Sequence, residues 1–285
     1  MPLVPVGVAV VTSSPQPLVS VIVPTCNSAR FLALCLESIQ GQTYPRIEVI
    51  VVDNYSTDAT VAIARLAGAT VLLAAPERSA QVNHGVRNCH GEFIFRVDSD
   101  FYVQPQVVSE CMDILASGYD AVVVHNAPIV RGALSRIRKF EVDMYKYSLD
   151  HSAARFVRRS LFLKVGGYTE AITAGEDYDF QNKLVRARAR IGFCVSETVH
   201  LDEPSSLSLV LVKFFRYGQD FPKYRAANPE YRAVQLAFLR QDYFRHRTQF
   251  AKHPVLGLGL ALYHLSKYVA GAVGYATARL RRNAV

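Results

Sequence analysis

The chain has 285 residues, of which half are hydrophobic and 20% are charged, so it is long enough for one large folded domain with an appendage. This composition excludes disordered, collagen-like and disulfide-stabilised proteins, and five Cys residues without a CxxC pair exclude a dedicated cysteine–zinc site. The net charge of +8 lies entirely in residues 201–285, where 13 Lys and Arg face 5 Asp and Glu, and this basic, apolar tail favours an anionic membrane surface over nucleic acid as partner.

Short β-branched apolar runs alternate with segments of helical period along residues 19–125. The expected strands are residues 19–23, 47–52, 70–73, 92–97 and 121–125, and the expected helices are residues 29–40, 59–67, 79–88 and 106–117. This alternation predicts an α/β fold built on a parallel sheet. Ligands of such sheets bind beyond the carboxyl ends of the strands, which is where Asp53 and the segment Asp98–Asp100 are expected.

The pattern becomes less regular after residue 130. Residues 131–150 are basic and amphipathic, residues 153–163 resume ordered structure, and residues 166–168 form a turn. Gly175 is expected to open a helix of about 14 residues with acids in its first turn, where the helix dipole favours them. Two short strands, at residues 191–195 and 198–201, are expected to close the α/β domain. The predicted limits are therefore residues 1–17 for an N-terminal extension and residues 18–202 for this domain.

Two acidic positions carry the chemistry that the residues themselves predict. Asp98 and Asp100 stand two residues apart, so an extended segment would place both carboxylates on one face. Such a pair can hold Mg²⁺ or Mn²⁺ whose remaining ligands are substrate phosphates, which indicates a metal–diphosphate ligand. Asp53, at a neighbouring strand end, is suited to contact with a nucleoside. The first strand is not followed by GxGxxG, and the chain has no P-loop and no GxSxG, which argues against dinucleotide binding, P-loop chemistry and an α/β-hydrolase.

Four segments, in this order, resemble motifs of the family 2 glycosyltransferases. They are VSVIVPTCN at Val19–Asn27, IVVDNYSTD at Ile50–Asp58, GEFI with DSD at Gly91–Asp100, and GEDYDF at Gly175–Phe180. The resemblance covers about residues 19–200, and the four motifs are specific only in combination. It implies a GT-A fold, which is a Rossmann-like, mostly parallel sheet flanked by helices. It also implies an inverting enzyme that uses Mn²⁺ or Mg²⁺ and a nucleotide-sugar donor, either GDP-mannose or a UDP-sugar.

The resemblance further implies roles for individual residues. The residues implied in nucleotide-sugar binding are Pro24, Thr25, Asn27, Asp53, Arg78, Asp98, Ser99, Lys213 and Arg216. Asp98 and Asp100 match the metal-binding DXD pair, with Asp100 as the direct ligand and His200 as a further ligand. Asp177 matches the general base, which must take the proton of the attacking hydroxyl, and Glu176 beside it contacts the acceptor. The metal ion offsets the charge that develops on the leaving diphosphate.

Several of these residues have a second interpretation. Arg78 is equally compatible with a solvated surface position, and His200 with a hydrogen-bonded structural role. The stretch KFFRY at Lys213–Tyr217 differs from the QxxRW motif of processive family members, which argues against processive polymer synthesis. Its two cations could hold a diphosphate or form the basic face of an interfacial helix. Asn54 and Tyr55 replace the acid and the glycine that are usual there, which could alter the choice of nucleotide.

The tail divides into two expected parts. Residues 203–252 are predicted to form basic amphipathic interfacial helices, and residues 253–285 a hydrophobic membrane segment with a basic end. The 25 residues 254–278 would reach about 37 Å as a helix, enough to cross a hydrocarbon core of about 30 Å. Their one formal charge, Lys267, would cost about 2.5–3.5 kcal/mol at mid-span. A single span, a re-entrant hairpin, an in-plane helix and a buried helix of a soluble dimer all remain open.

We therefore expect a membrane-associated enzyme at the cytoplasmic face. Attachment to a membrane suggests a lipid-linked acceptor of the polyprenyl or dolichyl phosphate type, or a glycan. Two alternatives remain: a sugar-phosphate nucleotidyltransferase and a catalytically degenerate membrane scaffold. The first usually has a Gly-rich, basic loop after the first strand, which Pro24–Asn27 is not, and the acids Asp53, Asp98, Asp100 and Asp177 argue against the second.

Overall fold

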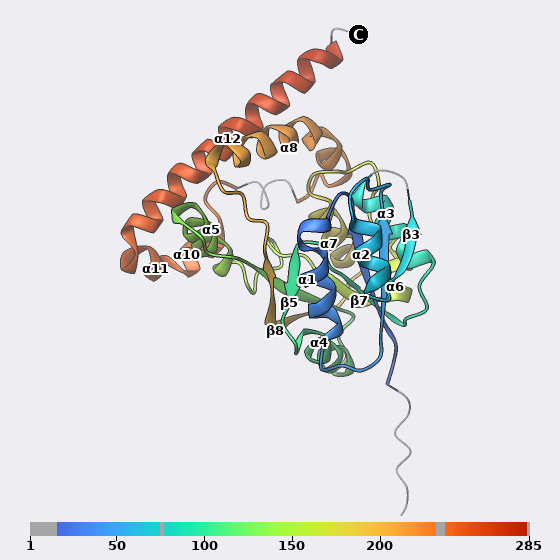
Figure 1. Cartoon of the computed structure of the whole chain (residues 1–285). Helices are drawn as coiled ribbons and strands as arrows, with labels where there is room; N and C mark the ends of the chain where they lie inside the picture. The colour runs from blue at the N-terminus through green and yellow to red at the C-terminus, as the bar shows by residue number, and fades with distance from the viewer. Residues whose placement is uncertain (1–15, 75–76, 232–236, 284–285) are drawn as a thin grey trace, which may run out of the picture.

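The computed structural model describes residues 16–74, 77–231 and 237–283 (Figure 1). Most of the predicted N-terminal extension, residues 1–15, therefore lies outside the described residues. The described residues up to 202 form an α/β domain around one sheet, and those from 203 onward add a layer of helices that ends in the long helix α12.

An eight-stranded sheet forms the centre of the α/β domain, in the order β3-β2-β1-β4-β7-β6-β8-β5. The strands are β1 Val19–Thr25, β2 Ile47–Asp53, β3 Thr70–Leu73, β4 Phe93–Arg96, β5 Phe101–Val103, β6 Ala121–Pro128, β7 Phe156–Arg158 and β8 Ile191–His200. Strands β3, β2, β1 and β4 are parallel, and so are β6 and β8. Strand β7 is antiparallel to both β4 and β6, and β5 is antiparallel to β8. The predicted α/β fold with a mostly parallel sheet is confirmed.

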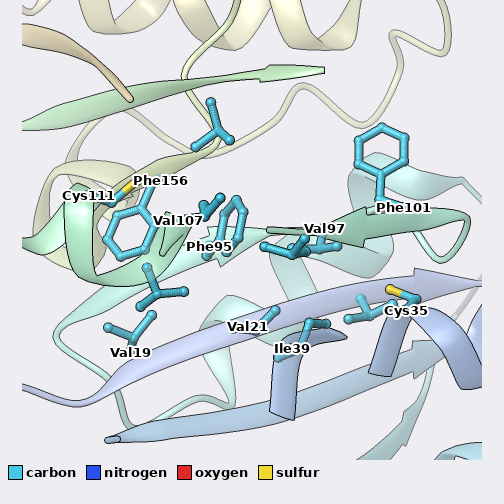
Figure 2. Close-up of a cluster of buried hydrophobic side chains, with 14 of the residues drawn as sticks. Val19, Val21, Cys35, Ile39, Phe95, Val97, Phe101, Val107, Cys111 and Phe156 are labelled. Atoms are coloured by element: carbon cyan, nitrogen blue, oxygen red, sulfur yellow. The ribbon is translucent and has the colours of Figure 1, made fainter. Parts of the chain in front are cut away.

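Helices cover both faces of this sheet and continue into the C-terminal layer. They are α1 Ala29–Gln40, α2 Thr60–Leu66, α3 Arg78–Arg87, α4 Val107–Ala116, α5 Ala133–Asp143, α6 Arg159–Lys164, α7 Glu176–Arg186, α8 Leu207–Ala227, α10 Gln241–Arg245, α11 Arg247–Lys252 and α12 Pro254–Asn283. The residues of α1 and α4 that face the sheet join the core cluster in Figure 2, including Ile39 and Val107. Strand β1 is buried along its whole length, because side chains of both parities pack under helices.

Three local features differ from the prediction. Strand β8 is one strand of ten residues instead of two, because Glu110 and Gln104 accept the backbone N–H groups of Ser196 and Glu197 and so satisfy the polar residues at its centre. Strand β5 was not predicted. Helix α7 has 11 residues instead of about 14, since Arg188 adopts a left-handed conformation (φ 57°) that turns the chain.

The segment that contains Asp98 and Asp100 is a turn and not an extended strand. The backbone N–H of Phe101 donates to the carbonyl oxygen of Asp98 at 3.0 Å, and β5 begins at Phe101. The two carboxylates consequently do not share one face, and each has different partners, as described below.

The C-terminal helices pack closely on one another and on the α/β domain. Helices α8 and α12 cross at glycines, because a Cβ atom on Gly218 would lie 2.0 Å from the carbonyl oxygen of Gly271, and one on Gly274 would lie 2.0 Å from that of Phe215. The Lys267 ammonium of α12 points into the protein and lies 3.1 Å from Glu141 of α5.

None of the described helices combines the length and the apolar character that a membrane crossing requires. The single span that the sequence left open for residues 253–285 is therefore not found among residues 253–283.

Candidate active site

A cavity of about 830 Å³ opens beyond the carboxyl ends of β1, β2 and β4. These three strands are parallel neighbours, so the segments that follow them meet at one edge of the sheet. The start of α7 and the end of β8 complete the wall. The predicted site residues that line it are Pro24, Thr25, Asn27, Arg78, Asp98, Ser99, Asp100, Glu176, Asp177, His200 and Lys213.

Two predicted donor-binding residues do not line this cavity. Asp53 is fully buried at the end of β2, where its carboxylate accepts hydrogen bonds from Thr25 Oγ1 at 2.9 Å and from Ser56 N and Oγ at 2.8 and 2.6 Å. It therefore ties the turn after β2 to the end of β1, and Asn54 lines the cavity in its place. Arg216 is exposed on α8 and, unlike Lys213, lies outside the cavity wall.

Two arginines hold the acids on the floor of the cavity. Arg155, which precedes β7, donates to Asp98 Oδ2 at 2.8 Å and to Asp177 Oδ2 at 3.0 Å. Arg96, the last residue of β4, donates to Asp177 Oδ1 and lies 3.2 Å from Asp98 and 3.3 Å from Glu176. The antiparallel pairing of β4 with β7 brings the two guanidinium groups together, and each bridges Asp98, which follows β4, and Asp177 of α7.

This ionic cluster sets the protonation of the two acids that open α7. Burial alone raises the pKa of Asp177, but Arg96 and Arg155 outweigh it and hold that pKa below its ordinary value. Asp98 behaves in the same way, and its pKa lies well below its ordinary value. Burial and the neighbouring Asp177 charge raise the pKa of Glu176. Asp177 is therefore an ionised carboxylate on the cavity wall at neutral pH, able to accept a proton from a hydroxyl group.

A second group on the wall suits a divalent cation. His200 Nε2 lies 2.9 Å from Asp100 Oδ2, since the pairing of β5 with β8 sets Phe101 opposite His200. The other ring nitrogen, Nδ1, lies 2.7 Å from Glu203, whose carboxylate also pairs with Arg138. Burial by itself lowers the pKa of His200. The hydrogen bonds to the two carboxylates raise this pKa by more than burial lowers it, so that it lies at about 9.

These donors fit Mn²⁺ or Mg²⁺ only as part of a shared site. Among the described residues, no group of three or more His, Cys, Asp or Glu side chains is placed to hold a metal ion by itself. At neutral pH a metal ion would have to displace the proton that a pKa of about 9 keeps on His200. The ring would then offer Nε2 beside the Asp100 carboxylate while Glu203 orients it, and substrate oxygens and water would supply the other ligands. Asp98 is committed to two arginines, which separates it from Asp100 within the predicted metal pair.

The sequence analysis missed four residues of the site: Arg96, Arg155, Arg138 and Glu203. A signal existed for Arg96, because an arginine inside a buried apolar strand requires anionic partners, and Asp98 stands two residues away. Arg155 and Arg138 depend on chain segments that only the folded protein brings together, whereas Glu203 stands only three residues after His200.

The chain resembles known proteins along most of its length. The model of glycosyl transferase family 2 matches residues 20–166. An uncharacterized glycosyltransferase of Rickettsia typhi is 28% identical over 190 residues, which cover 60% of this chain and 59% of that protein. Chondroitin synthase of Escherichia coli is 28% identical over 182 residues, which cover 59% of this chain and 26% of the synthase. The chain thus spans less than two thirds of the length of these curated relatives.

Two solved structures share the arrangement of strands and helices. A mannosyltransferase of Pyrobaculum calidifontis, in complex with GDP-Man and Mn²⁺, has a TM-score of 0.64 and 18% identity, with 90% of this chain and 88% of that chain covered. Glucosyl-3-phosphoglycerate synthase of Mycobacterium tuberculosis, solved with Mn²⁺ and UDP, has a TM-score of 0.54 and 18% identity over 74% of this chain and 80% of that chain. These likenesses show a GT-A-like fold.

Proposed function

The chain belongs to glycosyl transferase family 2, and from this membership we propose that it transfers a sugar from a nucleotide-sugar donor to an acceptor hydroxyl with inversion. The observation that carries the proposal is that the ionised Asp177 and the Asp100–His200 pair lie on the wall of the same cavity of about 830 Å³. GDP-mannose and UDP-sugars are both candidate donors, since the similar structures named above contain GDP-Man in one case and UDP in the other, each with Mn²⁺.

The residues of the cavity divide the reaction between them. The donor diphosphate would lie against Asp100, His200 and Lys213, where a bound divalent ion would offset the charge of the leaving group. The acceptor oxygen bonds to the anomeric carbon while the bond from that carbon to the diphosphate oxygen breaks, and the electron pair leaves with the nucleoside diphosphate. Asp177 takes the acceptor proton, and Arg96 and Arg155 keep its carboxylate ionised and fixed in direction.

We place this enzyme on the cytoplasmic face of a membrane, with α12 lying in the plane of the surface. The exposed side of α12 carries apolar residues three or four positions apart: Val255, Leu258, Leu262, Leu265, Val269 and Val273. Because Lys267 points inward, this side has no formal charge between residues 254 and 278. Exposed Arg247 and Lys252 precede it, and exposed Arg279 and Arg281 follow it. An uncharged side with cations at both ends suits an anionic lipid surface, from which a lipid-linked acceptor would reach the site.

A thermal-shift panel tests the donor site. UDP, GDP, CDP and dTDP are each added with Mn²⁺, Mg²⁺ or EDTA to the wild type, to Asp100→Asn and to the control Asp113→Asn, which changes an exposed acid of α4. We expect one nucleotide to stabilise the wild type and the control, by about 2.7 kcal/mol at 100 times its Kd, only when metal is present and not in Asp100→Asn.

The same panel and a separate assay for pyrophosphate release distinguish the alternatives. Binding of no nucleotide under any condition would favour the degenerate scaffold. Release of pyrophosphate from a nucleoside triphosphate and a sugar phosphate would favour the nucleotidyltransferase.

Sedimentation with lipid vesicles tests the membrane contact. We expect the wild type to bind vesicles that contain phosphatidylglycerol more strongly than vesicles of phosphatidylcholine alone. The triple variant Leu258→Ser, Leu262→Ser, Leu265→Ser should lose this binding, whereas Leu34→Ser, which changes an exposed apolar residue of α1, should keep it. Equal binding by the triple variant would contradict the proposal, and a change from dimer to monomer in that variant would assign the α12 side to a second copy.

A further inference from the structure

A second, smaller cavity adjoins the first on the far side of Asp177. Its volume is about 220 Å³, and it shares Asn126, Arg155, Asp177 and Tyr178 with the wall of the larger cavity. Beyond these shared residues it is lined by parts of β6 and by the loop that leads to β7, including His151. The carboxylate that is proposed to take the acceptor proton therefore lies between the two cavities. If the donor occupies the larger one, as proposed above, the smaller one lies on the acceptor side.

The lining of this smaller cavity carries buried polar atoms that the described protein leaves without hydrogen bonds. They are Asn126 Oδ1, His151 Nε2 and His125 Nε2. The His151 side chain is only 3% exposed, and its other ring nitrogen lies 2.8 Å from Asp242 Oδ2. His125 Nε2 has Asp143 at 3.7 Å, which is beyond hydrogen-bond reach. Buried polar atoms are nearly always paired in folded proteins, so a group of unpaired ones around a cavity points to a polar ligand.

The unpaired atoms indicate which hydrogen-bonding groups a ligand of this cavity must carry. Because His151 Nδ1–H donates to Asp242, its Nε2 presents a lone pair, and burial together with the nearby Arg240 charge lowers the pKa of His151 and keeps the ring neutral. Asn126 Oδ1 is also an acceptor, as is the Asp177 carboxylate. Two residues of the lining therefore carry unpaired acceptors, and Asp177 adds a third, which favours a ligand that carries several donors.

The charge and the volume of the smaller cavity restrict the class of ligand further. Arg155 lines the cavity, but its guanidinium already serves Asp98 and Asp177, so it offers little attraction to a phosphate. The volume of about 220 Å³ is smaller than the roughly 300–1,000 Å³ of pockets that enclose drug-sized ligands, and suits a single ring. A sugar ring is neutral and carries several hydroxyl donors, and the Tyr178 and Tyr145 rings of the lining give it an aromatic surface.

We propose that this cavity binds the terminal sugar of a glycan acceptor, which deepens the proposed function and rests on it. Ring hydroxyls donate to Asn126 Oδ1 and His151 Nε2, and the nucleophilic hydroxyl donates to Asp177. That oxygen forms the new bond to the anomeric carbon of the donor, its proton passes to Asp177, and the electron pair of the broken bond leaves on the nucleoside diphosphate. The acceptor is accordingly the sugar end of a glycan and not a bare lipid phosphate.

Binding of small probes tests this assignment. Thermal shift and saturation-transfer NMR are run on protein that contains Mn²⁺ and the nucleoside diphosphate found above. The probes are p-nitrophenyl glycosides of glucose, galactose, mannose and N-acetylglucosamine, with farnesyl phosphate as the bare lipid phosphate. The variants are Ala153→Leu, which fills the cavity, and His151→Phe, which keeps the ring against Tyr145 and removes the acceptor. Ala116→Leu, on the exposed end of α4, is the matched control.

We expect at least one glycoside to bind the wild type and the control, and to bind both cavity variants about tenfold more weakly or not at all. Nucleoside diphosphate binding should be the same in all four proteins. The assignment is overturned if glycosides bind Ala153→Leu as well as the wild type, if none binds the wild type, or if farnesyl phosphate is the probe that Ala153→Leu excludes. Loss of nucleoside diphosphate binding in the wild type would instead overturn the proposed function.

Discussion

This protein has two clusters of buried, oppositely charged side chains, and they serve different purposes. At the sheet edge, Arg96 and Arg155 hold Asp98 and Asp177 on the wall of a cavity. Where the C-terminal layer meets the α/β domain, Glu141 of α5 faces Lys267, His264 and Arg240, none of which lines either of the two cavities of the active site. The first cluster leaves its carboxylates accessible to a ligand, whereas the second joins α12 to the α/β domain.

The comparison shows that burial of charge does not by itself mark a functional site. Burial opposes ionisation of Glu141 as it does of Asp177, and in both places the neighbouring cations outweigh it, so that both pKa values lie below their ordinary values. What distinguishes Asp177 is an open volume beside it. Substitutions in the first cluster should therefore change chemistry, and substitutions in the second should change stability.

Asp177→Asn is expected to have the largest effect on transfer. The amide has nearly the same shape but cannot take the acceptor proton, so the transfer rate should fall about 10²–10⁴-fold. Nucleoside diphosphate binding with metal should persist, because Asp100 and His200 are untouched. Initial rates with a labelled donor measure the first effect and thermal shift the second, with Asp113→Asn as the control. Undiminished transfer would remove Asp177 from its role.

Glu141→Gln should change stability instead. It leaves Lys267, His264 and Arg240 together without an anion, and loss of one partner of a buried ion pair costs about 3–5 kcal/mol. Urea unfolding measures this cost, and nucleoside diphosphate binding to the folded variant should be unchanged. An unaltered free energy of unfolding would show that this cluster does not hold α12.

The pH dependence of stability gives Glu141→Gln a second readout. The folded-state pKa of Glu141 lies below its ordinary value of 4.5, so its stabilising contribution is complete above that pH and is lost as the pH falls below it. The wild type should therefore lose more stability than the variant when both are acidified through this range. Parallel loss in the two proteins would contradict the assignment.

Glu203→Gln is expected to affect transfer less than Asp177→Asn does, and to do so through metal affinity. Glu203 contacts His200 Nδ1 and so orients the ring whose Nε2 faces Asp100. Loss of such an outer contact typically weakens metal binding about 10–100-fold. Titration with Mn²⁺ in the presence of nucleoside diphosphate measures the affinity, and Glu92→Gln, which changes an exposed acid, is the control. Transfer should recover at saturating Mn²⁺, and an unchanged affinity would rule out this positioning role.

Much of the fold could be predicted because its signals are local. The bounds of α1 and β3 agree with the prediction residue for residue, since each depends on an apolar pattern with clear ends. Strand β5 has only three residues, too few for any periodicity to show. The continuity of β8 through Ser196 depends on Glu110, which lies 86 residues earlier in the chain. Contacts at such separation leave no pattern in the sequence.

The same distinction applies to the site. The sequence placed Asp98, Asp100, Asp177 and His200 in one site, and the structure brings all four to one cavity. It did not reveal that Arg155 joins two of them, because that contact depends on the antiparallel pairing of β4 with β7. Asp53 was expected at a nucleoside, but Thr25 and Ser56 take up its carboxylate.

Lys267→Met is expected to have the smallest effect at neutral pH. Glu141 keeps His264 and Arg240 as partners, and a methionine chain preserves the packing against Tyr263. Burial lowers the pKa of Lys267 from 10.5 to about 8, in spite of the Glu141 charge. Between these two values the unfolded chain binds a proton that the folded chain has released, so the stability of the wild type relative to the variant should rise with pH.

Urea unfolding of both proteins at about pH 7 and about pH 10 measures this rise. A constant difference would mean that Lys267 stays charged in the folded protein throughout the range, held by Glu141 as tightly as Arg155 is held by Asp98. A rising difference would mean that the second cluster tolerates loss of one charge. The ionic contacts of α12 would then be partly replaceable by apolar packing, whereas Asp177 of the first cluster has no apolar substitute, because only an ionised carboxylate there can take a proton.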